Sequence, residues 1–308
     1  MTKVNVRRLI RDLIITFILG ACFLIYFTGC KTVPEVDEFG NPLPDYKIES
    51  ELNFQTDIPE PSKYIFIRLY DLHYNNPFNP ANFLRFCVKS TEVSDTIASH
   101  ASIGFSLNDE FYGLTSGGDH QLAIESCTDT KSNKFMKKCN PKKSKQFTYA
   151  LKVTEKEYNA VKVFVEGYAN STEIKYDVWK NFDMASFATK RKFFTDEEEQ
   201  KFGNVKYPYL KDNKKTKIDN WETHFVCSTF VAYTLVVNIM PIRYWFLDNK
   251  IDYRYVNVTD LIQIPGVVKL FESPFYAYNE GALAFVEENP EFGEYLDLYE
   301  EPPIAENF

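Results

Sequence analysis

Residues 224–237 constrain the fold most, because they combine the approach to a buried element with a mostly apolar helix. After Ser228 the residues at helical spacing are Phe230, Val231, Thr234, Leu235 and Val237. Cys227 is therefore expected at or next to the first turn of a helix that packs inside the protein. Ser228 and Thr229 are natural capping residues for that turn.

A cysteine at this place has two interpretations. A thiol at a helix start lies near the positive end of the helix dipole and near unpaired backbone N–H groups, which favour the thiolate. The same N–H groups can stabilise an oxyanion. Alternatively Cys227 only packs, because free cysteines are among the most buried residues of proteins. The rest of the chain has to decide between a nucleophile and a core residue.

Composition narrows the class of protein. With 308 residues, 44% of them hydrophobic, the chain is long enough for one large domain or two small ones. Its net charge of -8 disfavours nucleic acid as the main partner. The six cysteines are too few and too irregularly spaced for a disulfide scaffold, and no pair has the spacing of a zinc site. We expect no metal and no cofactor.

The first 30 residues have the pattern of an export signal, with a basic start followed by an apolar run from Leu13 to Phe27. The run ends in Phe27-Thr28-Gly29-Cys30, which resembles a bacterial lipoprotein signal. That resemblance implies that Cys30 is lipidated and becomes the mature N-terminus. The alternative is an uncleaved membrane anchor, although the run is short of the roughly 20 residues of a relaxed span. Either form would tether the domain outside the cytoplasm.

Four segments are expected: a signal or anchor at 1–30, a Pro-rich acidic linker at 31–62, a folded domain at 63–285 and an acidic tail at 286–308. The linker is predicted to be extended rather than packed, and the tail to be peripheral. Seven lysines between 131 and 145 indicate a solvated loop, or alternatively a contact with anionic lipid or wall polymer. Cys139 lies within this loop and could pair with Cys127 if the compartment is oxidising.

Within the domain, alternating and apolar runs predict a series of strands and helices. The predicted strands are 64–69, 99–107, 110–115, 121–125, 147–153 and 253–258. Asn108-Asp109 is a turn signal that makes the second and third of these a hairpin. Thr154 and Glu157 have the spacing of a capping box, followed by an apolar face on a helix. Further helices are predicted at 79–88 and 179–194, with an irregular lysine-rich loop at 201–217, and a turn or short helix at Thr259-Asp260.

His100 begins the second predicted strand, on one face with Ser102, Gly104 and Ser106. A histidine on a polar strand face is usually a surface residue. Together with a cysteine at a helix start, it becomes a candidate general base.

Two motifs stand in a recognisable order: Ser-His-Ala-Ser-Ile-Gly-Phe at 99–105 and Phe-Val-Cys-Ser-Thr-Phe-Val-Ala-Tyr at 225–233. Together they resemble the circularly permuted, papain-like branch of the NlpC-type cysteine peptidase superfamily, specifically its YiiX-like members. The resemblance covers about residues 64–276 and includes the segments around Tyr112-Gly113, Glu125 and Thr259-Asp260. It implies an α+β fold in which a central antiparallel sheet packs against the helix that starts at the catalytic cysteine.

The resemblance also implies the chemistry. Cys227 would attack a carbonyl carbon, and His100 would take the thiol proton and return it to the leaving group. A third polar group should orient the imidazole. Glu125, at the end of a strand, is the preferred candidate, with Tyr112 and Ser116 as alternatives. His224, His73 and His120 are expected to bond locally or to lie in loops.

Three functions stay open. The first is a membrane-tethered thiol hydrolase of the cell envelope that cleaves an amide bond in a small substrate, such as a peptidoglycan peptide. The second is a lipid-directed acyltransferase or thioesterase with the same thiol. The third is a non-catalytic module that binds a peptide or lipid.

Overall fold

The computed structural model describes segments of the chain between residues 44 and 297. They are residues 44–76, 98–115, 121–129, 131, 136–172, 174–177, 223–249, 251, 253 and 256–297. The chain divides into two units, Met1–Pro44 and Asp45–Phe308. Several predictions lie outside the described residues: the signal segment with Cys30, the helices at 79–88 and 179–194, the loop at 201–217, Ser116 and His120.

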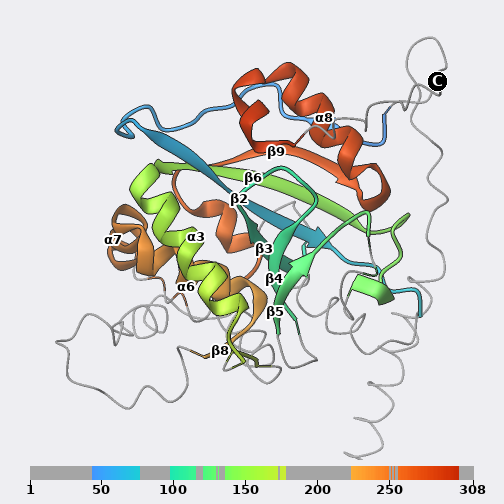
Figure 1. Cartoon of the computed structure of the whole chain (residues 1–308), viewed down its shortest axis with the longest axis horizontal. Helices are drawn as coiled ribbons and strands as arrows, with labels where there is room; N and C mark the ends of the chain where they lie inside the picture. The colour runs from blue at the N-terminus through green and yellow to red at the C-terminus, as the bar shows by residue number, and fades with distance from the viewer. Residues whose placement is uncertain are drawn as a thin grey trace, which may run out of the picture. The chain divides into compact units, whose positions relative to one another are not determined.

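A sheet in the order β1-β9-β6-β2-β3-β4-β5 forms the centre of the second unit, and each neighbouring pair is antiparallel (Figure 1). Its strands are β1 (Lys47–Ile48), β2 (Ser62–Asp71), β3 (His100–Gly104), β4 (Phe111–Leu114), β5 (Leu122–Glu125), β6 (Lys145–Thr154) and β9 (Val267–Pro274). The short strands β7 (Lys175–Tyr176) and β8 (His224–Phe225) form a separate parallel pair. The expected α+β class with an antiparallel sheet is confirmed.

Helices cover both faces of this sheet (Figure 1). The α-helices are α3 (Glu155–Ala169), α6 (Cys227–Asn238), α7 (Met240–Asp248) and α8 (Tyr278–Glu288). Short 3-10 turns are η1 (Met136–Lys138), η4 (Thr259–Gln263), η5 (Phe275–Ala277) and η6 (Pro290–Tyr295). One core lies between the sheet and α3, α6 and α7, and a second lies between the sheet and α8.

The two cores explain why β2 is buried along most of its length. Ile65, Ile67 and Leu69 belong to the core under α3 and α6, while Phe66 and Tyr70 belong to the core under α8. Successive side chains of a strand point to opposite faces, so a strand in the middle of three layers needs apolar residues on both.

The predicted capping box starts α3 as expected. The Glu157 N–H donates to Thr154 Oγ1 at 3.3 Å, and the Thr154 N–H donates to Glu157 Oε2 at 3.1 Å. The apolar face then buries Tyr158, Val161 and Val165 against the sheet. Two otherwise unsatisfied N–H groups are thereby bonded at the helix start.

The polar face of β3 is buried, because the core under α8 covers it. Two predictions are corrected by packing. The predicted strand at 253–258 is not one in its described residues, since the Val256 N–H turns back to the Tyr253 carbonyl. The folded part also extends beyond 63–285: β1 pairs with β9, and η6 buries Phe292.

Within the described residues, none of the helices taken alone is long and apolar enough to cross a membrane. The α6–α7 pair meets those two criteria only together, and it is bent by 113°.

Removal of the capping hydroxyl gives the first prediction. Thr154→Ala should lower the free energy of unfolding by about 1 kcal/mol, because the helix start loses its side-chain acceptor. Urea denaturation followed by circular dichroism measures this change. Val163→Ala on the same helix is the matched control, since Val163 is 70% exposed. It should not destabilise the protein, because alanine is the better helix former. Equal losses in both variants would contradict the capping role.

Candidate active site

Cys227 is the first residue of α6, as expected, and it is 5% exposed. The residue before the helix is Val226, in an extended conformation, and its apolar side chain offers no acceptor to the N–H groups of the first turn. The first-turn N–H groups therefore keep their bonding capacity next to the sulfur. A helix start without a side-chain cap can accept a negatively charged group.

Of the two predicted capping residues, Thr229 takes part in the helix start and Ser228 does not. Ser228 Oγ donates to the Val256 carbonyl at 2.7 Å, so it ties α6 to a distant segment instead. Thr229 Oγ1 accepts from the Val226 N–H at 3.0 Å and lies 3.2 Å from the Val226 carbonyl. Thr229 thus holds the residue before Cys227 in place from inside the helix.

His100 is the first residue of β3 and is 2% exposed. It lies opposite Tyr70 of β2, and the centroids of their rings are 5.3 Å apart. The hydroxyls of Tyr70 and Ser102 share a hydrogen bond at 2.8 Å beside it. The imidazole therefore sits on a buried strand face with restricted freedom to turn.

Glu125 is the last residue of β5 and is fully buried. Both of its carboxylate oxygens lie 2.9 Å from His100 Nε2. This contact occupies one ring nitrogen, so Nδ1 is the nitrogen that remains for another partner. The preferred candidate for the third group is thus the residue that meets the imidazole.

Cys227 also lies close enough to His100 to affect the charge on its ring. Burial by itself opposes a charge on His100, but the negative charges of Glu125 and Cys227, with hydrogen bonds to both, raise the pKa of His100 to about 10. A proton on the ring is stabilised by anionic groups on both sides. A protonated imidazole therefore lies beside the sulfur at the start of α6, and cysteine nucleophiles use this pairing of residue types.

Tyr112, an alternative for the third group, does not face His100. It lies on the opposite face of β4, where its ring packs beside Phe105.

Two other histidines have partners close to them in the sequence. Nδ1 of His224 lies 2.9 Å from the Thr223 hydroxyl, and Nε2 of His73 lies 3.5 Å from the carboxylate of Asp71. His224 therefore bonds locally, as expected, and His73 lies just after the end of β2, outside the strand.

Tyr74 is a residue that the sequence gave no reason to select. Burial and the nearby anionic groups of Cys139, Tyr176, Cys227 and Glu125 raise the pKa of Tyr74. It comes soon after the end of β2, at the same end of the sheet as Tyr70 and His100. Its bridge to Cys139 is a long-range contact, and such a contact is not readable from one sequence.

The remaining expectations concern metals and cysteines. Within the described residues, no group of three or more His, Cys, Asp or Glu side chains is arranged to hold a metal ion. Cys127 and Cys139 are both described, and both carry reduced thiols, so the disulfide considered between them is not formed.

Comparison of the chain with protein-family models, curated proteins and solved structures gave no match.

The charge balance around His100 gives a second prediction. Glu125→Gln should lower the pKa of His100 from about 10, because the amide cannot stabilise the imidazolium by charge. Titration of the His100 ring by NMR measures this shift. Tyr112→Phe, on the other face of β4, is the control and should leave the titration unchanged. If His100 titrates identically in Glu125→Gln and wild type, the carboxylate does not stabilise the ring proton.

Proposed function

We propose that the chain is a thiol hydrolase that cleaves an amide bond, with Cys227 as nucleophile, His100 as acid and base, and Glu125 as the group that orients His100. One observation carries the proposal: a buried imidazole bonds Glu125 through Nε2, and the thiol at the start of α6 is near enough to help raise the pKa of that imidazole. A helix start, a base and an orienting carboxylate are the parts that cysteine nucleophiles need. The base and the carboxylate come from β3 and β5, which are close in sequence, and the thiol comes from α6, which lies much later in the chain.

The reaction follows from the positions of these groups. The Cys227 thiolate adds to the carbonyl carbon, and the negative charge moves to the carbonyl oxygen. Backbone N–H groups in the first turn of α6, including that of Cys227, would stabilise this oxyanion. The His100 imidazolium gives its proton to the leaving nitrogen as the C–N bond breaks, which leaves a thioester on Cys227.

The second half of the reaction reverses the proton transfers. Neutral His100 takes a proton from water, whose oxygen adds to the thioester carbonyl. Collapse of this intermediate breaks the C–S bond and releases the carboxylic acid product and the thiolate. Glu125 keeps the imidazole in one orientation and stabilises its positive charge through both halves.

We also propose the family and place. The order of His100 and Cys227, with an antiparallel sheet packed on the helix that starts at the cysteine, supports the permuted papain-like, YiiX-like assignment. The N-terminal pattern supports tethering outside the cytoplasm, either through a lipid on Cys30 or through the apolar run itself. A cell-wall peptide is then the substrate class that such a location would supply.

The function is tested by trapping the thioester. Incubation with p-nitrophenyl acetate should add one acetyl group to Cys227, detected by peptide mass mapping. His100→Ala should slow this acylation by about 10²–10⁴-fold, because the general base is lost. Cys227→Ala should abolish it, while Tyr112→Phe should acylate at the wild-type rate. Absence of acylation in the wild type, with an iodoacetamide reactivity no greater than that of an ordinary thiol, would favour the non-catalytic module.

The substrate class needs a second arm of the same experiment. Wild-type protein is mixed with a muropeptide digest in one tube and with phosphatidylcholine vesicles in another, quenched in acid, and mapped. We expect a peptidyl adduct on Cys227 from the muropeptides. A fatty-acyl adduct from the vesicles alone would overturn the amide assignment in favour of lipid-directed acyl transfer.

A further inference from the structure

The carboxylate of Glu125 occupies space that exists only because residue 113 is glycine. A Cβ built on Gly113 would overlap the Cδ and both oxygens of Glu125. The backbone of Gly113 does not itself require glycine, since Gly266 is the described glycine that has a positive φ. Glycine is therefore needed at position 113 because any larger side chain would clash with Glu125, and not because the backbone adopts a conformation that only glycine tolerates. Gly113 lies opposite Ser102 on β3 and Ala123 on β5, between the strands of His100 and Glu125.

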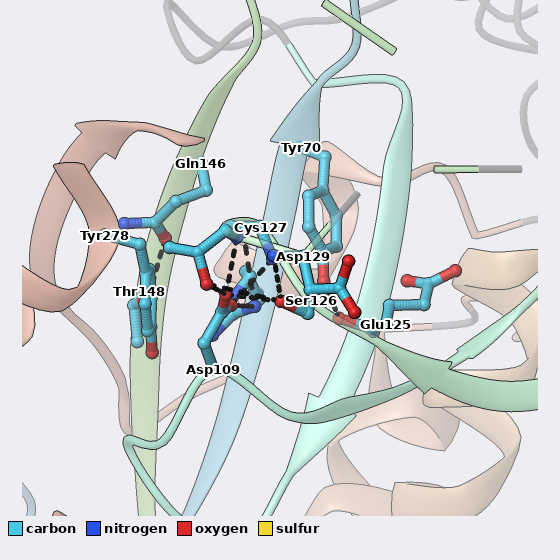
Figure 2. A network of polar contacts seen from close by, with 12 residues as sticks. Tyr70, Asp109, Glu125, Ser126, Cys127, Asp129, Gln146, Thr148 and Tyr278 are labelled. Atoms are coloured by element: carbon cyan, nitrogen blue, oxygen red, sulfur yellow. Dashed lines mark hydrogen bonds and ion pairs between the residues drawn. The ribbon is translucent and has the colours of Figure 1, made fainter. Parts of the chain in front are cut away.

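The chain immediately after Glu125 is held by a second carboxylate, that of Asp109 (Figure 2). Asp109 accepts the N–H of Cys127 at 2.8 Å and the N–H of Thr128 at 2.6 Å. It also accepts the hydroxyls of Ser126 and Thr128, both at 2.7 Å. One side chain thus bonds three consecutive residues that follow Glu125, so the end of β5 has little freedom to move.

Asp109 is itself fixed to the centre of the sheet by a buried ion pair. Arg68 Nη1 donates to Asp109 Oδ1 at 2.8 Å, and the two side chains are 0% and 8% exposed. The guanidinium lies over the rings of Phe111 at 3.7 Å and Tyr278 at 4.0 Å. Arg68 is opposite Ser102 on β3, two positions along β2 from the partner of His100.

A buried ion pair is a poor source of net stability, because desolvation offsets most of the attraction. A pair of apolar residues would fill the same space at lower cost. Two nitrogens of Arg68, Nε and Nη2, lack hydrogen-bond partners within the described residues, which adds to that cost. The role of the pair is instead positional. Arg68 fixes the carboxylate of Asp109, and this carboxylate holds the residues that follow β5 in one place.

Building on the proposed function, we propose that Gly113 and the Arg68–Asp109 pair form a preset support for Glu125, and that Gly113 and Asp109 are positioning residues for the imidazole of His100. Gly113 leaves the room in which the carboxylate lies, and Asp109 fixes the chain that carries it. The orientation of His100 is then determined before any substrate binds, which is the condition for efficient proton transfer.

The experiment uses Gly113→Ala in the full chain, with Gly167→Ala as the matched control. A Cβ on Gly167 would meet nothing within 4 Å, so this second glycine replacement has no neighbour to displace. Gly113→Ala should displace Glu125, lower the pKa of His100 as Glu125→Ala does, and slow acylation by p-nitrophenyl acetate about 10²-fold. Gly167→Ala should change neither quantity. Glycine is a weak strand residue, so alanine at 113 should not weaken the sheet by itself.

A double-mutant cycle separates positioning from general damage. In a Glu125→Ala background, Gly113→Ala should have no further effect on the His100 titration or the acylation rate, because the displaced group is already gone. Glu125→Asp should restore part of both in Gly113→Ala, since its shorter side chain avoids the new methyl group. Full additivity of the two changes, or an unmoved His100 titration in Gly113→Ala, would overturn the proposal.

Two features keep the test informative in other cases. If Gly113→Ala does not fold, Ser126→Ala replaces it, because it removes one bond to Asp109 and should shift the His100 titration in the same direction by a smaller amount. If wild-type Cys227 is not acylated at all, the proposed hydrolase fails, but the NMR titration still decides whether Gly113 and Asp109 position the pair.

Discussion

Glu125 is fully buried, and a carboxylate withheld from water is stable only where a donor or a positive charge meets it. The imidazole of His100 is that group, with Nε2 at 2.9 Å from both carboxylate oxygens. The thiol of Cys227 depends in turn on this contact, since a ring held on one side by Glu125 presents its other nitrogen in a single direction. The layers on both faces of the sheet exclude water from the pair, and this strengthens the electrostatic attraction between Glu125 and His100.

The sheet and the helices on its two faces contribute differently to the position of His100 and Glu125. The core under α3 and α6 brings the start of α6 to the sheet, with Ser228 bonded to the Val256 carbonyl as a long-range tie. The core under α8 covers the opposite face, where β3, β4 and β5 place His100, Gly113 and Glu125 side by side. The residues of the candidate site therefore lie on strands and a helix rather than on loops, and such sites are held more precisely.

Local patterns predicted the parts of the structure whose causes are local. The hairpin around Asn108-Asp109, the capping box at Thr154 and the helix at Cys227 are each determined by residues a few positions apart. The role of Ser228 was predicted wrongly because a distant segment decides it: its hydroxyl bonds the Val256 carbonyl. The burial of the polar face of β3, the partners of Arg68 and Asp109, and the position of Tyr74 were not predicted, because each depends on contacts between distant parts of the chain.

The helix that carries the thiol has a consequence for how such a protein can change over generations. Ten of the twelve residues of α6 are buried, so nearly every substitution along it disturbs the core. By contrast, α3 and α7 present exposed positions such as Val163 and Tyr244. Sequence divergence should therefore concentrate in the outer helices, while the length and bulk of α6 stay nearly constant and keep the sulfur in register with the imidazole.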